Sequence, residues 1–210
     1  MRFLFLLNVF TLIVSCQIED KSWIRLFNGK DLSGWEHVGE GSFEVVDGML
    51  ITKGGMGLLW YTKQKFQDCK IKVVFTGQDK NNAGVFIRIP ERPIEAWMPV
   101  NKGYEVQIDD REDEYHKTGV LYSMTKAKAK PSMVRKWNTM VITLDGNRTL
   151  VEVNGTLITD FVEGDLVPEK KYSWEPDRGP RPITGYIGLQ NHGLDDLIYF
   201  KEVSFKKLKS

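Results

Sequence analysis

The segment Tyr104–Asp109 has residue types and spacing suited to proton transfer, because it alternates strictly between apolar and polar side chains. Alternate side chains of a β-strand share a face, so Glu105, Gln107 and Asp109 form one polar row. The row contains no Lys or Arg, and unpaired carboxylates gathered on one face are typical of concave sites. The same alternation is typical of a strand with a solvated outer face. The spacing alone leaves both interpretations open.

Two other segments carry groups that could act together with this row. Arg88 alternates with Phe86 in an apolar run. An Arg in such a run is either a surface residue on an edge strand or a cation that holds a carboxylate or a sugar oxygen. Polar residues also cluster at the end of a later strand, at Gln190, Asn191 and His192. The ordinary pKa of histidine suits proton transfer near neutrality, although a histidine at a strand end is more often structural.

Aromatic side chains offer stacking faces for sugar rings, and the chain contains six tryptophans. Trp97 and Trp174 lie near prolines in segments without strand character, so they are the candidate stacking platforms. Trp137 adjoins an apolar strand and is predicted to be a core residue.

Short segments with strand character occupy most of the chain after Trp23 and are separated by Gly, Asn and Asp. Asp47-Gly48 stands between two apolar runs and predicts a tight hairpin. No segment predicts a helix: Pro131 interrupts the best candidate, and residues 168–182, with four prolines, are expected to form a long loop. We therefore expect residues 23–210 to form one all-β domain, a sandwich or barrel.

The first residues indicate export from the cell. Arg2 precedes an apolar stretch that is too short to span a bilayer but fits the hydrophobic region of a secretory signal. The stretch ends at Cys16 in a sequence that resembles a bacterial lipobox. We expect residues 1–15 to be a signal peptide, Cys16 to be lipidated, and residues 16–22 to tether an exported lipoprotein of the cell envelope. An ordinary signal peptide, or a buried strand that ends in Cys, is the alternative.

Composition narrows the possible functions. The 210 residues carry a net charge of +1, which does not indicate a nucleic-acid partner, and contact with a membrane is expected through the lipid alone. Zinc-type cysteine clusters, P-loops and dinucleotide glycine fingerprints do not occur in the sequence. Cys69 has no partner for an internal disulfide if Cys16 is lipidated, and it is predicted to be a small buried residue that opens a strand.

Seven motifs, in order along the chain, resemble those of the bacterial 3-keto-disaccharide hydrolase family, and the resemblance extends over essentially all of residues 23–208. The motifs are LFNGKDLSGW at 26–35, NAGVFIR at 82–88, GYEVQID at 103–109, TGVLY at 118–122, WN at 137–138, VNG at 153–155 and GLQNHG at 188–193. The chain departs from the family at Ala83, where Ser is usual, and at Lys201-Glu202, where Arg-Asn is frequent.

The resemblance implies a concanavalin-like jelly roll, a β-sandwich of two antiparallel sheets. It also implies cleavage of a glycoside whose C3 hydroxyl has already been oxidised to a ketone, so a separate sugar 3-oxidoreductase would supply the substrate. The ketone acidifies the proton on C2, and a base that removes this proton allows the glycosidic oxygen to leave C1. Water then adds to the product.

Under this implied mechanism, His192 and Glu105 would serve as base and acid, in either order. Arg88 and Gln107 would stabilise the developing charge, and Asp109 would orient one of the two catalytic groups. Gln190, Asn191, Trp97 and Trp174 would contact the sugar. Similar enzymes can use a divalent metal ion, which Glu105 and His192 could recruit.

Two rival functions stay open: a non-catalytic carbohydrate-binding lipoprotein on the same scaffold, and a conventional endo-glycanase. Conventional glycosidases need two carboxyl groups roughly 5–5.5 or 6.5–9.5 Å apart. Glu105 and Asp109 are four residues apart, so their backbones lie ~13 Å apart along a straight strand. The spacing therefore favours the keto-sugar mechanism over direct hydrolysis.

Overall fold

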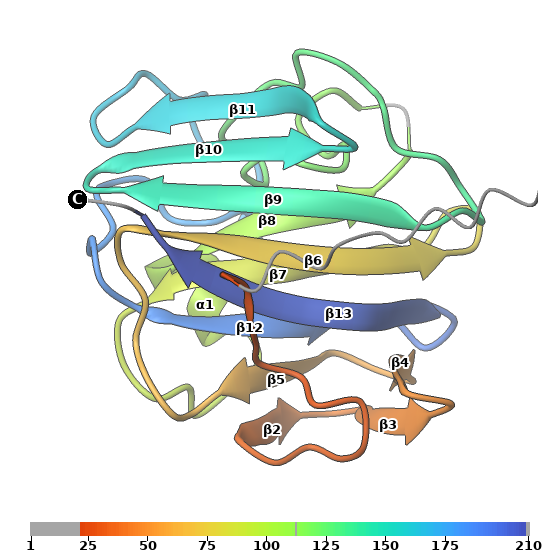
Figure 1. Cartoon of the computed structure of the whole chain (residues 1–210). Coiled ribbons are helices and arrows are strands. Elements are labelled where there is room, and N and C mark those ends of the chain that lie inside the picture. Colours follow the sequence, from red (N-terminus) through yellow and green to blue (C-terminus); the bar gives the residue numbers. More distant parts are fainter. Residues whose placement is uncertain (1–21, 112, 209–210) are drawn as a thin grey trace, which may run out of the picture.

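The computed structural model describes residues 22–111 and 113–208, which form two antiparallel sheets packed face to face (Figure 1). The eight-stranded sheet contains, in order, β11 (Thr156–Val162), β10 (Arg148–Val153), β9 (Asn138–Asp145), β6 (Cys69–Gly77), β13 (Ile198–Lys207), β4 (Met49–Lys53) and β3 (Ser42–Val46), with β1 (Ile24–Arg25) paired to β13. The five-stranded sheet contains β2 (Trp35–Gly39), β5 (Gly57–Tyr61), β12 (Tyr186–Asn191), β7 (Asn82–Ile89) and β8 (Tyr104–Asp109). The predicted all-β jelly-roll sandwich is confirmed.

Local sequence explains the turns between the strands. Asp47 and Gly48 join β3 to β4 with φ angles of 50° and 76°, so both adopt the left-handed backbone that a tight two-residue hairpin requires. The hairpin predicted from this dipeptide is confirmed. Residues 168–182 form the predicted long loop between β11 and β12.

The main hydrophobic core lies between the sheets, where Tyr104, Val106 and Ile108 of β8 and Ile187 and Leu189 of β12 point inward. A second apolar cluster covers part of the opposite, outer face of the five-stranded sheet. Its members from the sheet are Leu58, Trp60, Phe86 and Ile89, and Ala96, Met98 and Val100 pack over them.

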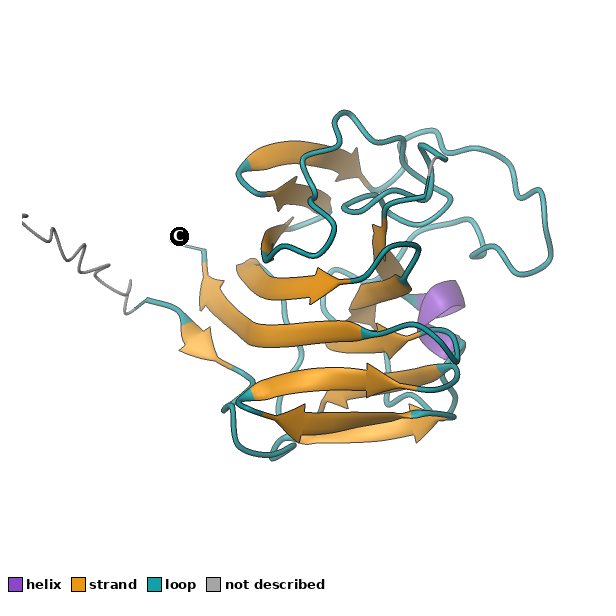
Figure 2. Ribbon diagram, turned by 90° about the vertical axis from the view of Figure 1, so that its right-hand side faces the viewer, coloured by secondary structure: helices purple, strands orange, loops and turns teal. Residues whose placement is uncertain are grey.

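The prediction that the chain contains no helix is wrong, because residues Met98–Lys102 form one short helix, α1. Pro99 stands at its first turn, where the missing N–H costs nothing, and the apolar contacts of Met98 and Val100 hold the turn on the sheet. Figure 2 shows α1 beyond the five-stranded sheet, on the side away from the eight-stranded sheet, and loops overhang this same side. No helix within residues 22–111 and 113–208 is long and apolar enough to cross a bilayer.

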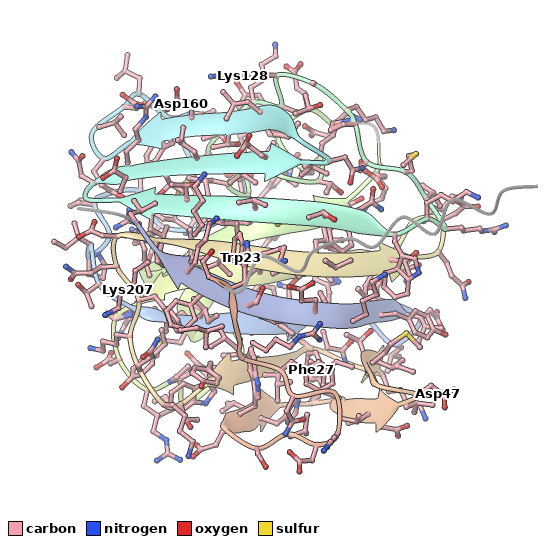
Figure 3. The ribbon with its side chains drawn as sticks, viewed as in Figure 1. Trp23, Phe27, Asp47, Lys128, Asp160 and Lys207 are labelled. Carbon is pink, nitrogen blue, oxygen red and sulfur yellow. The ribbon has the colours of Figure 1, made fainter. Side chains whose placement is uncertain are left out.

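The outer face of the eight-stranded sheet carries exposed aromatic and basic side chains. Trp23 lies on this face (Figure 3), and the Nζ atoms of Lys72 and Lys206 lie 4.6 Å and 4.8 Å from the centre of its ring. Trp137, predicted to be a core residue, is instead 41% exposed, and Lys201 lies over its ring. Cys69 is buried at the start of β6 as predicted, and burial raises the pKa of its thiol to about 12. The predicted signal peptide and Cys16 lie outside the described residues.

Candidate functional site

The polar row of β8 lies on the outer face of the five-stranded sheet and is nevertheless buried. Glu105, Gln107 and Asp109 are 6%, 1% and 1% exposed, so the solvated-face interpretation is wrong. Residues 118–122 run antiparallel along the free edge of β8: Thr118 N donates to Asp109 O, and Tyr122 N donates to Glu105 O. Loop backbone thus closes the edge beside the row.

Glu105 occupies space that a glycine leaves open. A Cβ atom at Gly84 would lie 2.6 Å from Cγ and 2.8 Å from Oε1 of Glu105. In the register of β7 with β8, Gly84 lies opposite Gln107, whereas Glu105 lies opposite Phe86. The side chain of Glu105 therefore leans along the sheet, toward the end of the row at which Asp109 lies.

Burial makes Glu105 a weak acid. Loss of solvation raises the pKa of its carboxyl to about 8; a hydrogen bond with the Gln190 side chain opposes the shift, and the charge of Asp109 adds to it. A carboxyl with this pKa is mostly protonated at neutral pH, so Glu105 can donate a proton to a leaving group.

Asp109 is held by Arg111 and is not free to act as a nucleophile. Its Oδ1 atom accepts a hydrogen bond from Arg111 N at 2.8 Å, and its Oδ2 atom accepts one from Arg111 Nε at 2.7 Å. The side chain of Arg111 is 54% exposed, so its guanidinium presents a positive charge to solvent beside Asp109, at one end of the row. Hydrogen bonding to Asp109 raises the pKa of Arg111, and the nearby charge of Asp196 adds to this effect.

A chain of hydrogen bonds links the middle of the row to His192. Gln107 Nε2 donates to Asn82 Oδ1 at 2.6 Å, and Asn82 N donates to Asp196 Oδ1 at 2.8 Å. The second carboxylate oxygen, Asp196 Oδ2, lies 3.3 Å from Nδ1 of His192. Asn82 lies opposite Asp109 in the strand register, so the pair of His192 and Asp196 lies at the Asp109 end of the row.

The His192–Asp196 pair has the arrangement of an oriented base. Burial alone would raise the pKa of Asp196, but the hydrogen bonds from His192 and from Asn82 N outweigh it and lower that pKa. An ionised Asp196 that accepts from Nδ1–H leaves the Nε2 atom of His192 free to take a proton. The imidazole is 39% exposed in its side chain, which allows contact with a ligand.

Two amide oxygens of the site have no partner among the described residues. Oε1 of Gln107 and Oε1 of Gln190 are buried and accept no hydrogen bond there. Buried acceptors are nearly always satisfied in folded proteins, and hydroxyl groups of a sugar are suitable donors.

The predicted role of Arg88 at this row is wrong, because Arg88 points to the other side of the sheet. It has a φ of 56°, and the pairing of β12 with β7 shifts register between Tyr186 and Gly188. This bulge breaks the alternation of β7 and turns the side chain into the sandwich. There, fully buried, its guanidinium donates to the carbonyl oxygens of Gly146, Arg148 and Pro182.

Asn191 is also misassigned. It has the same orientation as Leu189, toward the core, and its Nδ2 donates to Lys53 O at the end of β4. It therefore ties the two sheets together. Gln190, by contrast, belongs to the row through its contact with Glu105.

The two tryptophans chosen as sugar platforms are exposed, as a platform requires. Trp97 is 45% exposed immediately before α1. Trp174 is 58% exposed in the loop after β11, and its ring stacks on Tyr172 with a centroid distance of 4.6 Å and an angle of 3°.

Glu105 and His192, the two candidate ligands of a divalent metal ion, belong to no cluster of three or more His, Cys, Asp or Glu side chains that could hold one within residues 22–111 and 113–208. The donors present therefore do not fit a divalent ion bound by protein groups alone.

Comparison with known proteins shows the family of the chain. The sequence model of the 3-keto-alpha-glucoside-1,2-lyase-like domain matches residues 22–209. The chain belongs to this family. No curated protein matches the chain in sequence.

Solved structures support the fold of this family member. It is similar to a proposed glycosyl hydrolase of Parabacteroides distasonis ATCC 8503, with 22% identity, a TM-score of 0.75, and coverage of 92% of this chain and 99% of that one. A second such protein from the same organism has 25% identity, a TM-score of 0.71 and coverage of 89% and 99%. A Bacillus subtilis protein of unknown function with a galectin-like fold has 12% identity, a TM-score of 0.61 and coverage of 88% and 94%.

Four residues of the candidate site were not predicted from the sequence: Gly84, Asn82, Arg111 and Asp196. Gly84 and Asn82 belong to the recognised motif at 82–88 and could have been found from it. Arg111 lies in an acidic run that is typical of a solvated loop. Asp196 lies 114 residues from Asn82, and only the fold joins them.

Proposed function

We propose that this protein cleaves 3-keto-glycosides by eliminating the group at C1 after removal of the proton on C2, followed by hydration. One arrangement carries the proposal: Glu105, a buried carboxyl whose raised pKa favours its protonated form, lies in the polar row, and hydrogen bonds link Gln107 of that row through Asn82 and Asp196 to the imidazole of His192. The reaction requires a proton donor and a proton acceptor.

In the first step, Nε2 of His192 takes the proton from C2. The electron pair of the C2–H bond moves toward C3, and the C3 carbonyl becomes an enolate. Asp196 stabilises the imidazolium that forms, as its contact with Nδ1 indicates. The substrate is already a ketone, so this step needs no oxidant.

In the second step, the enolate collapses, C1 and C2 form a double bond, and the C1–O bond breaks. Glu105 gives its proton to the departing oxygen. Water then adds across the double bond: its OH binds C1 and its other proton restores the carboxyl of Glu105, while the imidazolium of His192 returns its proton to C2. The net reaction is hydrolysis of the glycosidic bond.

The developing negative charge on the enolate oxygen needs an electropositive neighbour. Arg111 supplies it in place of Arg88, because its exposed guanidinium lies beside Asp109 at the end of the row near His192. Gln107 and Gln190 supply buried acceptors for sugar hydroxyls.

Conventional hydrolysis by two carboxyls has weaker support. Asp109, the only other carboxyl of the row, is engaged by Arg111 through three atoms. Within the row, no carboxyl then remains free to act with Glu105 as the second carboxylate of a conventional glycosidase.

The test is to incubate the protein with 3-keto-trehalose and, separately, with trehalose and a β-glucan. Cleavage of the keto sugar alone supports the proposal. Cleavage of an unoxidised sugar would support a conventional glycanase, and binding without turnover would support a carbohydrate-binding protein.

We further propose that the protein acts as an exported lipoprotein of the cell envelope, lipidated at Cys16, beside a separate oxidoreductase that forms the C3 ketone. Incorporation of a labelled fatty acid in cells should be abolished by Cys16→Ser. Persistence of the label in that variant would contradict the assignment.

A further inference from the structure

A cavity lies beyond the edge of the five-stranded sheet, between residues 113–123 and residues 168–178. We call it the loop pocket; its volume is about 220 Å³, and its lining includes Tyr115, His116, Tyr172, Glu175 and Arg178. Pockets for drug-sized ligands usually measure roughly 300–1,000 Å³, so this one is suited to a single small ring.

An ion pair between the buried Glu175 and the partly buried Arg178 stabilises the loop pocket. Glu175 is 4% exposed, and its Oε2 atom accepts hydrogen bonds from Arg178 Nη2 at 3.1 Å and from Lys171 N at 2.9 Å. Arg178 also donates to Ser123 O at 3.3 Å and to Pro168 O at 2.8 Å. These bonds fix the two loops relative to each other, so the pocket is preformed.

The lining suits a neutral, hydroxylated ring. Tyr115 and Tyr172 supply aromatic surface, and Tyr172, 54% exposed and stacked on Trp174, presents a broad aromatic surface at the rim. Acidic and basic side chains nearly balance around the cavity: Asp113, Glu169 and Glu175 face Lys171 and Arg178. Aromatic faces beside carboxylates and cations match the apolar C–H face and the hydroxyl edge of a pyranose.

Tyr122 connects the loop pocket to Glu105. Its backbone N donates to Glu105 O at 2.9 Å, and its ring meets the ring of His116, which lines the pocket, at 5.1 Å between centroids. Burial raises the pKa of Tyr122 to about 12, and the charges of Glu105 and Glu175 both add to the shift. One residue thus lies within the influence of both sites.

The order of His192, Glu105 and the loop pocket along the row indicates which part of the substrate would reach the pocket. His192 and Asp196 stand at the Asp109 end of the row, whereas Glu105 and Tyr122 stand at the other end, next to the loop pocket. If the keto ring lies over the base, the glycosidic oxygen points toward Glu105 and the departing group extends beyond it.

We propose that the loop pocket binds the sugar that leaves with the glycosidic oxygen, and that Tyr172 and Glu175 determine the preference for this leaving group. This proposal rests on the proposed elimination reaction. The protein is then selective for a keto sugar joined to a second sugar, over the same keto sugar joined to a small alcohol.

The test compares two substrates that share the keto ring: 3-keto-trehalose, with a glucose leaving group, and methyl 3-keto-α-glucoside. Tyr172→Ala should lower kcat/KM for 3-keto-trehalose by about 10-fold, equivalent to about 1.4 kcal/mol, and leave the methyl glycoside within about twofold. Glu175→Gln should act in the same direction. Leu166→Ala, a fully exposed residue of the same loop, is the matched control and should change neither substrate.

The outcomes separate the two proposals. If the unaltered protein cleaves neither keto-glycoside, the proposed reaction is wrong. If it cleaves both, and Tyr172→Ala lowers both equally or changes neither, the reaction stands and the role of the loop pocket is wrong. Thermal unfolding of each variant checks that the fold has not been lost.

Discussion

The carboxyl of Glu105 lies over Gly84, in space that a Cβ atom at position 84 would fill. Strand β7, which pairs with β8, thus has no side chain at the position that the Glu105 carboxyl occupies. A side chain at this position would displace the side chain of Glu105 from its Cγ atom outward, and the backbone of Gly84 has no positive φ that only glycine tolerates.

Gly84→Ala should therefore fold and yet lose activity. We expect kcat to fall by at least about 10-fold, because a shift of the acid by about an ångström removes it from the leaving oxygen. Gly188→Ala is the matched control: its new Cβ meets Leu58 Cδ1 at 2.6 Å on the same face, not Glu105. Equal losses in the two variants would show that general packing, not the position of Glu105, is responsible.

Replacement of Glu105 by Gln should abolish proton donation. It should also remove the free-energy cost of burying an ionisable carboxyl. Glu105→Gln should lower kcat by about 10²–10⁴-fold. The rate of the unaltered protein should fall at alkaline pH as a group with a pKa of about 8 loses its proton. Glu95→Gln, which alters an exposed carboxylate in the loop before α1, should change neither kcat nor its pH dependence.

The raised pKa of Glu105 also predicts a pH-dependent stability. The unfolded carboxyl loses its proton near its ordinary pKa of 4.5, whereas the folded one keeps it until about 8. The folded state thus binds more protons than the unfolded state between these two pH values. The contribution of the Glu105 carboxyl to the free energy of unfolding is therefore full below about pH 4.5 and falls by a few kcal/mol as the pH rises to about 8. Urea titrations across this range should show the decline in the unaltered protein and a shallower slope in Glu105→Gln.

Asp196 should be essential for the base, although the proposed reaction assigns it no proton transfer. In Asp196→Asn, an amide NH2 placed toward His192 would force Nδ1 to accept, which places the proton on Nε2 and blocks it as a base. If the amide turns the other way, Asn82 N loses its acceptor instead. We expect a fall in kcat of about 10²-fold or more with little change in KM, measured on 3-keto-trehalose.

Asp195→Asn provides the control, because it removes the neighbouring, exposed carboxylate. A comparable loss of kcat in that variant would mean that local charge, not the orientation of His192, carries the effect.

The sequence predicted those parts of the site that depend on alternation along one strand. Glu105, Gln107 and Asp109 share a face because β8 is regular, and the Asp47-Gly48 hairpin follows from local backbone preference. Arg88 and Asn191 were misplaced for different reasons. A bulge at Arg88 reverses its direction, and Asn191 keeps the inward orientation that strand alternation gives it, where its polarity serves a bond between the sheets. Asp196 and Arg111 depend on loop packing between distant segments, which no local pattern encodes.

Arg88 gives the sharpest contrast between the sequence-based and structural interpretations. As a catalytic residue, it would affect turnover; as a buried donor to three carbonyl oxygens and to Thr149, it should affect folding. Arg88→Met keeps much of the volume but leaves buried carbonyls without donors, at a cost of about 1–3 kcal/mol each where water cannot reach them. We expect a much lower midpoint in thermal unfolding, and an unchanged kcat per folded molecule below that midpoint. Arg148→Ala, which breaks an exposed pair with Asp160, should cost less than about 1 kcal/mol. A large loss of kcat in Arg88→Met without a loss of stability would contradict the structural role and support a catalytic role of Arg88.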